Sequence, residues 1–81
     1  MMLVPIQVQC RSGFKADEKP TSFLCESSQI VVEEILDQWL QAGKDQHQAK
    51  ADYFKVQGND NHKYLLKHDL DLDQWFLENR W

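Results

Sequence analysis

The last third of the chain alternates apolar and polar residues in three short runs, at residues 52–57, 62–68 and 74–81. Alternation at a period of two is typical of β-strands with one buried face. Residues 58–61 and 69–73 join the runs and are rich in Gly, Asn and Asp, which tight turns favour. This third of the chain is therefore predicted to form a β-meander.

The turn at residues 58–61 also sets a register between the strands beside it. Symmetric closure of this turn predicts that Phe54 lies opposite Leu65 and that Lys55 lies opposite Tyr64. A shift of one residue would turn every side chain of a strand to its other face, so the register decides which residues enter the core.

Two more strands are predicted in the first third of the chain, at residues 3–11 and 21–26. Residues 15–20 are polar and are expected to form a surface loop, and residues 26–29 a turn. Pro5 has no amide hydrogen and favours the start of a strand or a sheet edge. The side chains predicted to face inward are Val4, Ile6, Val8, Cys10, Phe23 and Cys25.

Residues 29–41 fit two kinds of element. Their apolar residues recur at helical spacing, which is typical of an amphipathic helix. The β-branched run at residues 30–32 favours a strand, and a bulge at Glu33 and Glu34 would keep the apolar side chains on one face.

We expect a single domain, residues 1–81, of mainly β class. About five antiparallel strands would curl into a small open barrel that ends in the β-meander. The alternative is an α+β fold with one helix at 29–41 packed on a four-stranded sheet. Residues 41–50 are polar and are expected to form a loop, which is the best candidate in the chain for a disordered segment.

The chain resembles a family of small bacterial and archaeal domains of unknown function, over roughly residues 20–78. Their pattern is V-x-x-[IV]-L-x-x-W, then Y-[FYW]-x-V, Y-x-L and W-x-L after intervening loops. The resemblance implies a mainly β fold in which residues 29–40 form a bent strand, and it implies no known activity. The matching residues are Phe23, Val32, Ile35, Leu36, Trp39, Tyr53, Phe54, Val56, Tyr64, Leu66, Trp75 and Leu77.

Composition narrows the choice of partners and compartment. Nine basic residues are scattered among thirteen acidic ones, for a net charge of −4, which argues against nucleic acid as the main partner. The apolar runs are too short to cross a membrane, and the N-terminus does not resemble a signal peptide. We therefore expect a cytoplasmic protein with no membrane partner, in which Cys10 and Cys25 are reduced structural thiols. A disulfide between them is the alternative.

Asp69, Asp71 and Asp73 stand two residues apart, as at the start of a calcium loop. Such a loop needs Gly at its sixth position and Glu at its twelfth, where this chain has Gln74 and Arg80. We therefore predict a solvated acidic turn without a metal, with Leu70 and Leu72 pointing inward or over the turn. His47, His62 and His68 have no ligand spacing suited to zinc and are predicted to lie at the surface.

No residue pattern indicates a catalytic site or a cofactor. Trp39 and Trp75 are predicted to be core residues, because a small domain needs the area that large rings bury. Trp81 and Arg80, at the terminus, are candidates for contact with a partner.

The leading hypothesis is a non-enzymatic cytoplasmic binding or protein-interaction module that works with another protein, as a monomer or as a weak homodimer through an edge strand. The alternative is a small enzyme or enzyme subunit that uses Asp and His residues of the 62–73 turns. Binding of single-stranded nucleic acid on an aromatic sheet face is disfavoured by the negative charge.

Overall fold

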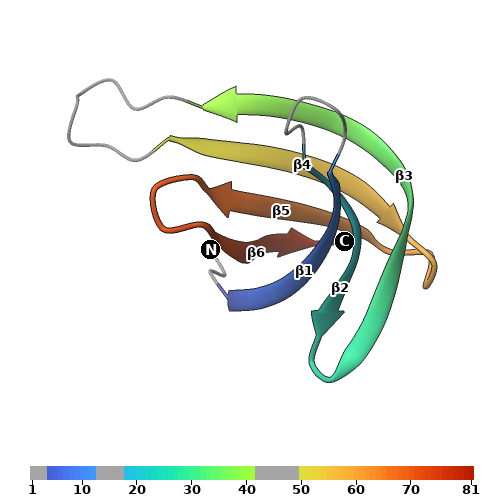
Figure 1. Ribbon diagram of the computed structural model, residues 1–81. Helices are drawn as coiled ribbons and strands as arrows, with labels where there is room; N and C mark the ends of the chain where they lie inside the picture. Colours follow the sequence, from blue (N-terminus) through green and yellow to red (C-terminus); the bar gives the residue numbers. More distant parts are fainter. Residues whose placement is uncertain (1–3, 13–17, 42–49) are drawn as a thin grey trace.

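The computed structural model describes residues 4–12, 18–41 and 50–81, which form a small antiparallel β-barrel (Figure 1). Neighbouring strands in the sequence pair with each other, and the last strand pairs with the first to close the barrel. The strands are β1 (Val4–Ser12), β2 (Glu18–Cys25), β3 (Ser28–Gln41), β4 (Ala51–Gly58), β5 (Lys63–Asp69) and β6 (Gln74–Arg80).

This architecture confirms the predicted mainly β barrel with a C-terminal meander. The α+β alternative is wrong, because residues 29–41 belong to a strand and the described residues contain no helix. The barrel has six strands and is closed, where about five strands and an open barrel were expected. Strand β2 also begins earlier than predicted, so that residues 18–20 belong to it and not to a loop. Most of the predicted 41–50 loop lies outside the described residues.

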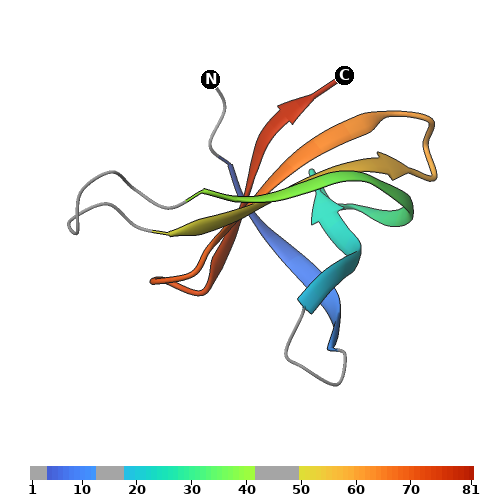
Figure 2. The same ribbon diagram turned by 90° about the horizontal axis from the view of Figure 1, so that it is seen from above.

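The barrel is not paired along its whole length, and strand β3 shows this most clearly. Residues 28–31 of β3 pair with β2, whereas residues 32–41 pair with β4 alone. The β3–β4 ribbon and the β1–β2 hairpin therefore project in different directions from the closed part of the barrel (Figure 2).

Two β-bulges allow β3 to leave the barrel. The register of β3 against β4 shifts between Val32 and Glu34 and again between Ile35 and Asp37, so Glu33 and Leu36 are the extra residues. A bulge adds one residue to the alternation and bends the strand. The bulge at Glu33 was predicted and keeps Val32 and Ile35 packed against the core, whereas the second bulge was not predicted.

Aromatic rings fill most of the barrel interior. Phe23 and Tyr64 meet edge to face with ring centroids 5.0 Å apart, and Phe54 and Trp75 contact each other at 5.5 Å. Edge-to-face and tilted pairs suit the charge distribution of aromatic rings and add to the free energy of burial. Gly58 completes the packing, because a Cβ atom there would lie 2.7 Å from the Ile30 side chain. The residues of this core are Ile6, Phe23, Cys25, Ile30, Phe54, Val56, Tyr64, Leu66, Trp75 and Leu77.

The predicted register of the β4–β5 hairpin is wrong by one residue. Phe54 lies opposite Leu66 and Lys55 lies opposite Leu65, so Leu66 enters the core while Leu65 is only half buried. Gln57 pairs with Lys63, and the Gly58 amide donates to the His62 carbonyl at 2.9 Å, so the turn is centred on Asp60 and has an odd number of residues, where the prediction assumed four. The prediction for Val4 is also wrong: it pairs with Leu77 at the start of β1 and is exposed.

The predicted turn between β2 and β3 is present and very tight. Cys25 pairs with Ser28, and both intervening residues have positive φ, 51° at Glu26 and 68° at Ser27. Positive φ at both central positions matches the right-handed twist of a two-residue hairpin, although Asn and Gly usually occupy those positions.

Asp60 fixes the turn between β4 and β5 to the core. Its carboxylate accepts hydrogen bonds from the Tyr64 hydroxyl and from the His62 amide. Burial acts to raise the pKa of Asp60, but these hydrogen bonds outweigh it and lower the pKa below its usual value. Burial, together with the bond to Asp60, raises the pKa of Tyr64 to about 12.

The Tyr64 hydroxyl should make stability depend on pH in alkali. An unfolded tyrosine ionises near pH 10, so the stability that comes from keeping Tyr64 neutral is complete below pH 10 and is lost as the pH rises through 12. We expect a loss of roughly 2–3 kcal/mol in the free energy of unfolding, since one pKa unit is worth about 1.4 kcal/mol.

Urea unfolding between pH 9 and pH 12 measures this loss. Tyr64→Phe should be less stable at pH 9 and should lack much of the further decline, whereas Tyr53→Phe, at a half-buried tyrosine, should decline as the unmodified protein does. An equal decline in Tyr64→Phe would contradict the role given to this phenol.

Candidate protein-interaction surface

One edge of β3 has no strand beside it in the described part of the chain. After Val31 no residue of β2 pairs with β3, and β4 occupies only the opposite edge. We call the side of residues 32–41 that faces away from β4 the open β3 edge. Residues 37–41 are its regular part, because they pair with consecutive residues of β4. Such an edge offers unpaired N–H and C=O groups to another strand.

Large apolar side chains are exposed along this edge. Leu40 is 60% exposed, Leu36 is 40% exposed and Trp39 is 38% exposed. The prediction that Trp39 is a core residue is therefore wrong, whereas Trp75, at 7%, is buried as predicted. Trp39 lies beyond the closed part of the barrel, where β3 pairs only with β4.

Trp39 is nevertheless held in place. Its ring stacks on that of Tyr53 across the ribbon, with centroids 5.4 Å apart and an angle of 6° between the planes. Tyr53 and Lys55 lie on the face of β4 opposite to Phe54, which points into the core. Trp39 therefore presents a flat, positioned ring on the outer face of the sheet.

Trp81 extends this outer face. The Lys55 Nζ atom lies 5.0 Å from the centre of the Trp81 ring, a cation–π contact. The Trp81 amide donates to the Lys63 carbonyl at 2.8 Å, and the His62 ring contacts the Trp81 carbonyl at 2.8 Å. The terminal residue is thus folded back on the sheet, yet 53% of it stays exposed. Arg80 pairs with Tyr64 and is also exposed, so both residues remain available to a partner.

The acidic residues of β3 line the same ribbon. Glu33, Glu34 and Asp37 are exposed, and among the described residues no ion pair involves them. Strand β3 contains no Lys or Arg. The open edge therefore combines exposed apolar groups with three carboxylates. Of these, Asp37 lies opposite Lys55 and accepts a hydrogen bond from the Gln38 amide at 2.8 Å.

The turn residues of the enzyme hypothesis have structural roles. Asp69 is buried, contrary to the prediction, and its Oδ1 accepts hydrogen bonds from the amides of Asp71 and Leu72 at 3.0 and 3.1 Å. A carboxylate that bonds the backbone two residues on stabilises a turn. The acidic turn is confirmed, but Leu70 and Leu72 are exposed rather than inward.

His68 is buried against Trp75, so the prediction that it lies at the surface is wrong. Its ring stacks on Trp75 with centroids 4.3 Å apart, and its Nε2 lies 2.9 Å from Oδ1 of Asp73. His62 is exposed as predicted, and His47 lies outside the described residues. In the described ranges no three His, Cys, Asp or Glu side chains are placed to hold a metal ion. The absence of a metal stays a prediction.

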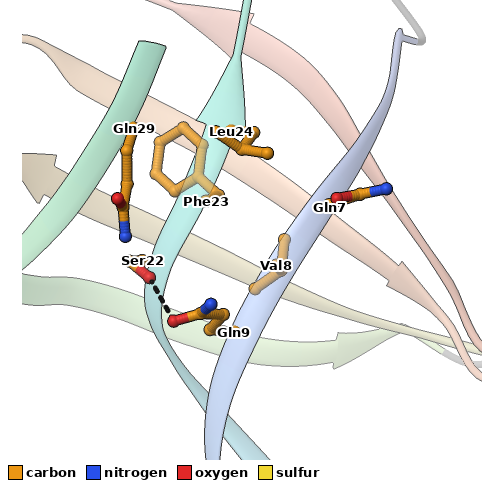
Figure 3. Close-up of a pocket in the computed structure, with 7 residues that line it drawn as sticks. All are labelled: Gln7, Val8, Gln9, Ser22, Phe23, Leu24 and Gln29. Carbon is orange, nitrogen blue, oxygen red and sulfur yellow. Dashed lines mark hydrogen bonds between the residues drawn. The ribbon is translucent and has the colours of Figure 1, made fainter. Parts of the chain in front are cut away.

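Three cavities lie around β1 and β2, away from these residues. The first, of about 260 Å³, is smaller than most ligand sites, and its lining contains no ionisable group (Figure 3). The Ser22 hydroxyl in it donates to the Gln9 amide oxygen at 3.2 Å (Figure 3). Its lining residues are Gln7, Val8, Gln9, Ser22, Phe23, Leu24 and Gln29.

The other two cavities lie where β1 leaves β2 to pair with β6. They measure about 290 and 460 Å³ and share Pro5, Ile6 and Leu24. The smaller one also contains Glu26 and Arg80. Asp60 and Tyr64, whose pKa values are shifted, line none of the three cavities. None of these three cavities is lined by an Asp or His residue of the 62–73 turns.

Cys10 and Cys25 are not joined by a disulfide. Cys10 pairs with Pro20, five positions along β2 from Cys25, which corresponds to a separation of about 16 Å at ~3.3 Å per residue. A disulfide requires Cα atoms within about 7 Å, so this fold excludes the Cys10–Cys25 bridge. Cys25 is buried as predicted, and Cys10 is partly buried.

Comparison with protein-family models, with curated proteins and with solved structures gave no match. The resemblance to a family of small β-domains stays a prediction. In the described segments no helix is long and apolar enough to cross a membrane.

The different settings of the two tryptophans predict different effects of truncation. Trp75→Ala removes a buried ring from the core and should lower the free energy of unfolding by about 3–5 kcal/mol. Trp39→Ala removes a ring that is 38% exposed and should cost about 1–2 kcal/mol, mostly from the lost stacking on Tyr53. Urea melts of the two variants side by side make the comparison. Equal losses would mean that Trp39 is a core residue after all.

Proposed function

We propose that this protein is a non-enzymatic protein-interaction module that binds an extended segment of another protein by strand addition at the open β3 edge. The observation that carries the proposal is the coincidence of an unpaired edge with exposed Leu36, Trp39 and Leu40 among the described residues. Backbone hydrogen bonds to an edge supply affinity in this mode of recognition, and alternate side chains supply specificity.

The choice of edge is supported by the way the rest of the barrel is protected. Residues 18–21 of β2 do not pair with β3, and Pro20 among them has no backbone N–H to donate. The open β3 edge has no proline, and Trp39 is a residue type that often dominates binding energy at interfaces. Strand addition is therefore favoured at β3 over β2.

We propose that the module works in the cytoplasm, because the fold excludes a Cys10–Cys25 disulfide and the buried Cys25 thiol is free, as expected in a reducing compartment. Trp81 and Arg80 are proposed as secondary contacts, because Trp81 adjoins Lys55 on the outer face that Trp39 and Tyr53 also occupy. No observation favours the enzyme hypothesis. Asp69 stabilises the β5–β6 turn through its hydrogen bond from the Asp71 amide, and Asp73 contacts the His68 ring.

Quantitative affinity capture tests this function. Bait carrying Leu40→Lys should lose the proteins that unmodified bait retains, because a lysine on the strand opposes docking of an apolar side chain. Leu72→Lys is the matched control: Leu72 is 69% exposed but lies in the β5–β6 turn, so this bait should retain them.

Circular dichroism must first show that both baits are folded. If the Leu40→Lys bait retained the same proteins as unmodified bait, or if the Leu72→Lys bait lost them equally, the open β3 edge would not be the binding site.

A further inference from the structure

The side chains of β3 divide between two faces of the ribbon, and the division is set by the register with β4. Glu34, Asp37 and Trp39 lie opposite Gln57, Lys55 and Tyr53, which face outward. Ile35 and Gln38 lie opposite Val56 and Phe54, which are fully buried in the core. Directly opposed residues of an antiparallel pair share a face. The outer face of β3 is thus acidic and aromatic, and its inner face carries Ile35, Gln38 and Leu40.

A strand added to the open β3 edge would continue both faces. Its outward side chains would lie beside Glu34, Asp37 and Trp39, and its inward side chains beside Ile35 and Leu40. Cations complement the outer face, because carboxylates attract them and an indole ring binds them through its π face. Aliphatic side chains complement the inner face.

We propose that the partner segment of the open β3 edge is an extended strand in which Arg or Lys alternates with aliphatic residues. Arg fits best, since its planar guanidinium both pairs with a carboxylate and stacks on Trp39. This inference rests on the proposed function, and it adds the chemistry of the partner.

A second copy of the chain is a poorer occupant. Antiparallel pairing of two β3 edges over residues 37–41 would place Asp37 opposite Gln41 and would supply no cation to any carboxylate. A longer overlap would bring Glu34 of one copy toward Asp37 of the other. Each copy also has a net charge of −4, which opposes their approach.

Synthetic peptides of about eight residues, a length sufficient for one strand, test the inference. One peptide alternates Arg and Val, and a second alternates Glu and Val. A third has the composition of the first with all Arg preceding all Val, so that it keeps the charge and loses the alternation. A fourth is the Arg–Val peptide with backbone N-methylation at every other residue, in both possible phases, which removes hydrogen-bond donors from one edge.

The Arg–Val peptide should bind about tenfold more tightly than the Glu–Val peptide, because its cations meet the carboxylates of Glu34 and Asp37, whereas the Glu side chains would be repelled by them. The rearranged peptide and one N-methylated phase should bind as weakly as the Glu–Val peptide. Fluorescence of Trp39 and calorimetry both report this binding.

Charge reversal on the protein provides the sharper comparison. The double variant Glu34→Lys with Asp37→Lys should reverse the preference and bind the Glu–Val peptide more tightly. Asp71→Lys, a charge reversal of an exposed aspartate in the β5–β6 turn, should leave the preference unchanged.

The remaining outcomes separate this inference from the proposed function. Equal binding of the Arg–Val and Glu–Val peptides would overturn the charge selection and leave strand addition standing. Equal binding of the alternating and rearranged Arg peptides would overturn alternation as the signal. If no peptide bound and the chain sedimented as a dimer that Leu40→Lys dissociates, the occupant would be a second copy. If no peptide bound to a monomer, the inference would fail, and the capture experiment alone would decide the function.

Discussion

The departure of β3 from β2 after Val31 determines the shape and the surface of this protein. At that point Asn59, in the β4–β5 turn, bonds Val31 twice: its amide donates to the Val31 carbonyl at 2.9 Å, and its side-chain oxygen accepts from the Val31 amide at 3.2 Å. The bulge at Glu33 follows and bends the strand. These contacts join Val31 to the β4–β5 turn at one end of the barrel. Beyond Val31, β3 pairs only with β4 in the described part of the chain.

The open β3 edge follows from this departure. Strand β3 has fourteen residues and its neighbours β2 and β4 have eight each, so β3 cannot be paired on both sides along its whole length. The second half of β3 carries Leu36, Trp39 and Leu40. Their side chains are exposed because this half of the strand lies outside the closed part of the barrel. The carboxylates among them oppose pairing with a second copy, in the way that charged residues protect exposed edges in other β-proteins. In our proposal the same charges also select the partner strand.

The sequence predicted the strands better than it predicted their mutual placement. Local alternation located the meander and the β-branched run located β3, because both are properties of a few neighbouring residues. The β4–β5 register was missed by one residue, since the turn is centred on Asp60 with an odd number of residues and has Asn61 at a positive φ of 66°. Trp39 was assigned to the core because a small domain needs the area of its ring, and because a continuous alternation from Ile35 would turn its side chain inward. The second bulge, at Leu36, interrupts that continuity, and a bulge has no strong local signal.

The sequence could predict what type of surface binds a partner, but not where that surface lies. An edge strand as a binding element could be expected of any small β-barrel, but which edge is open depends on pairings between distant segments, such as β1 with β6. Trp81 and Arg80 were chosen as candidate partner contacts because of their terminal position. The structure places Trp81 on the outer face beside Lys55. His68 was missed as a buried residue, because its stacking on Trp75 depends on the β5–β6 register.

Amide hydrogen exchange, followed residue by residue by NMR, tests the open β3 edge most directly. In a central strand every amide points to one neighbour or the other and is protected, whereas in an edge strand alternate amides point to solvent. We predict alternating fast and slow exchange along residues 37–41 and slow exchange at every residue from Tyr53 to Val56 in β4. Uniform slow exchange along residues 37–41 in the dilute monomer would contradict the account, because it would mean that another segment of the chain already covers the edge.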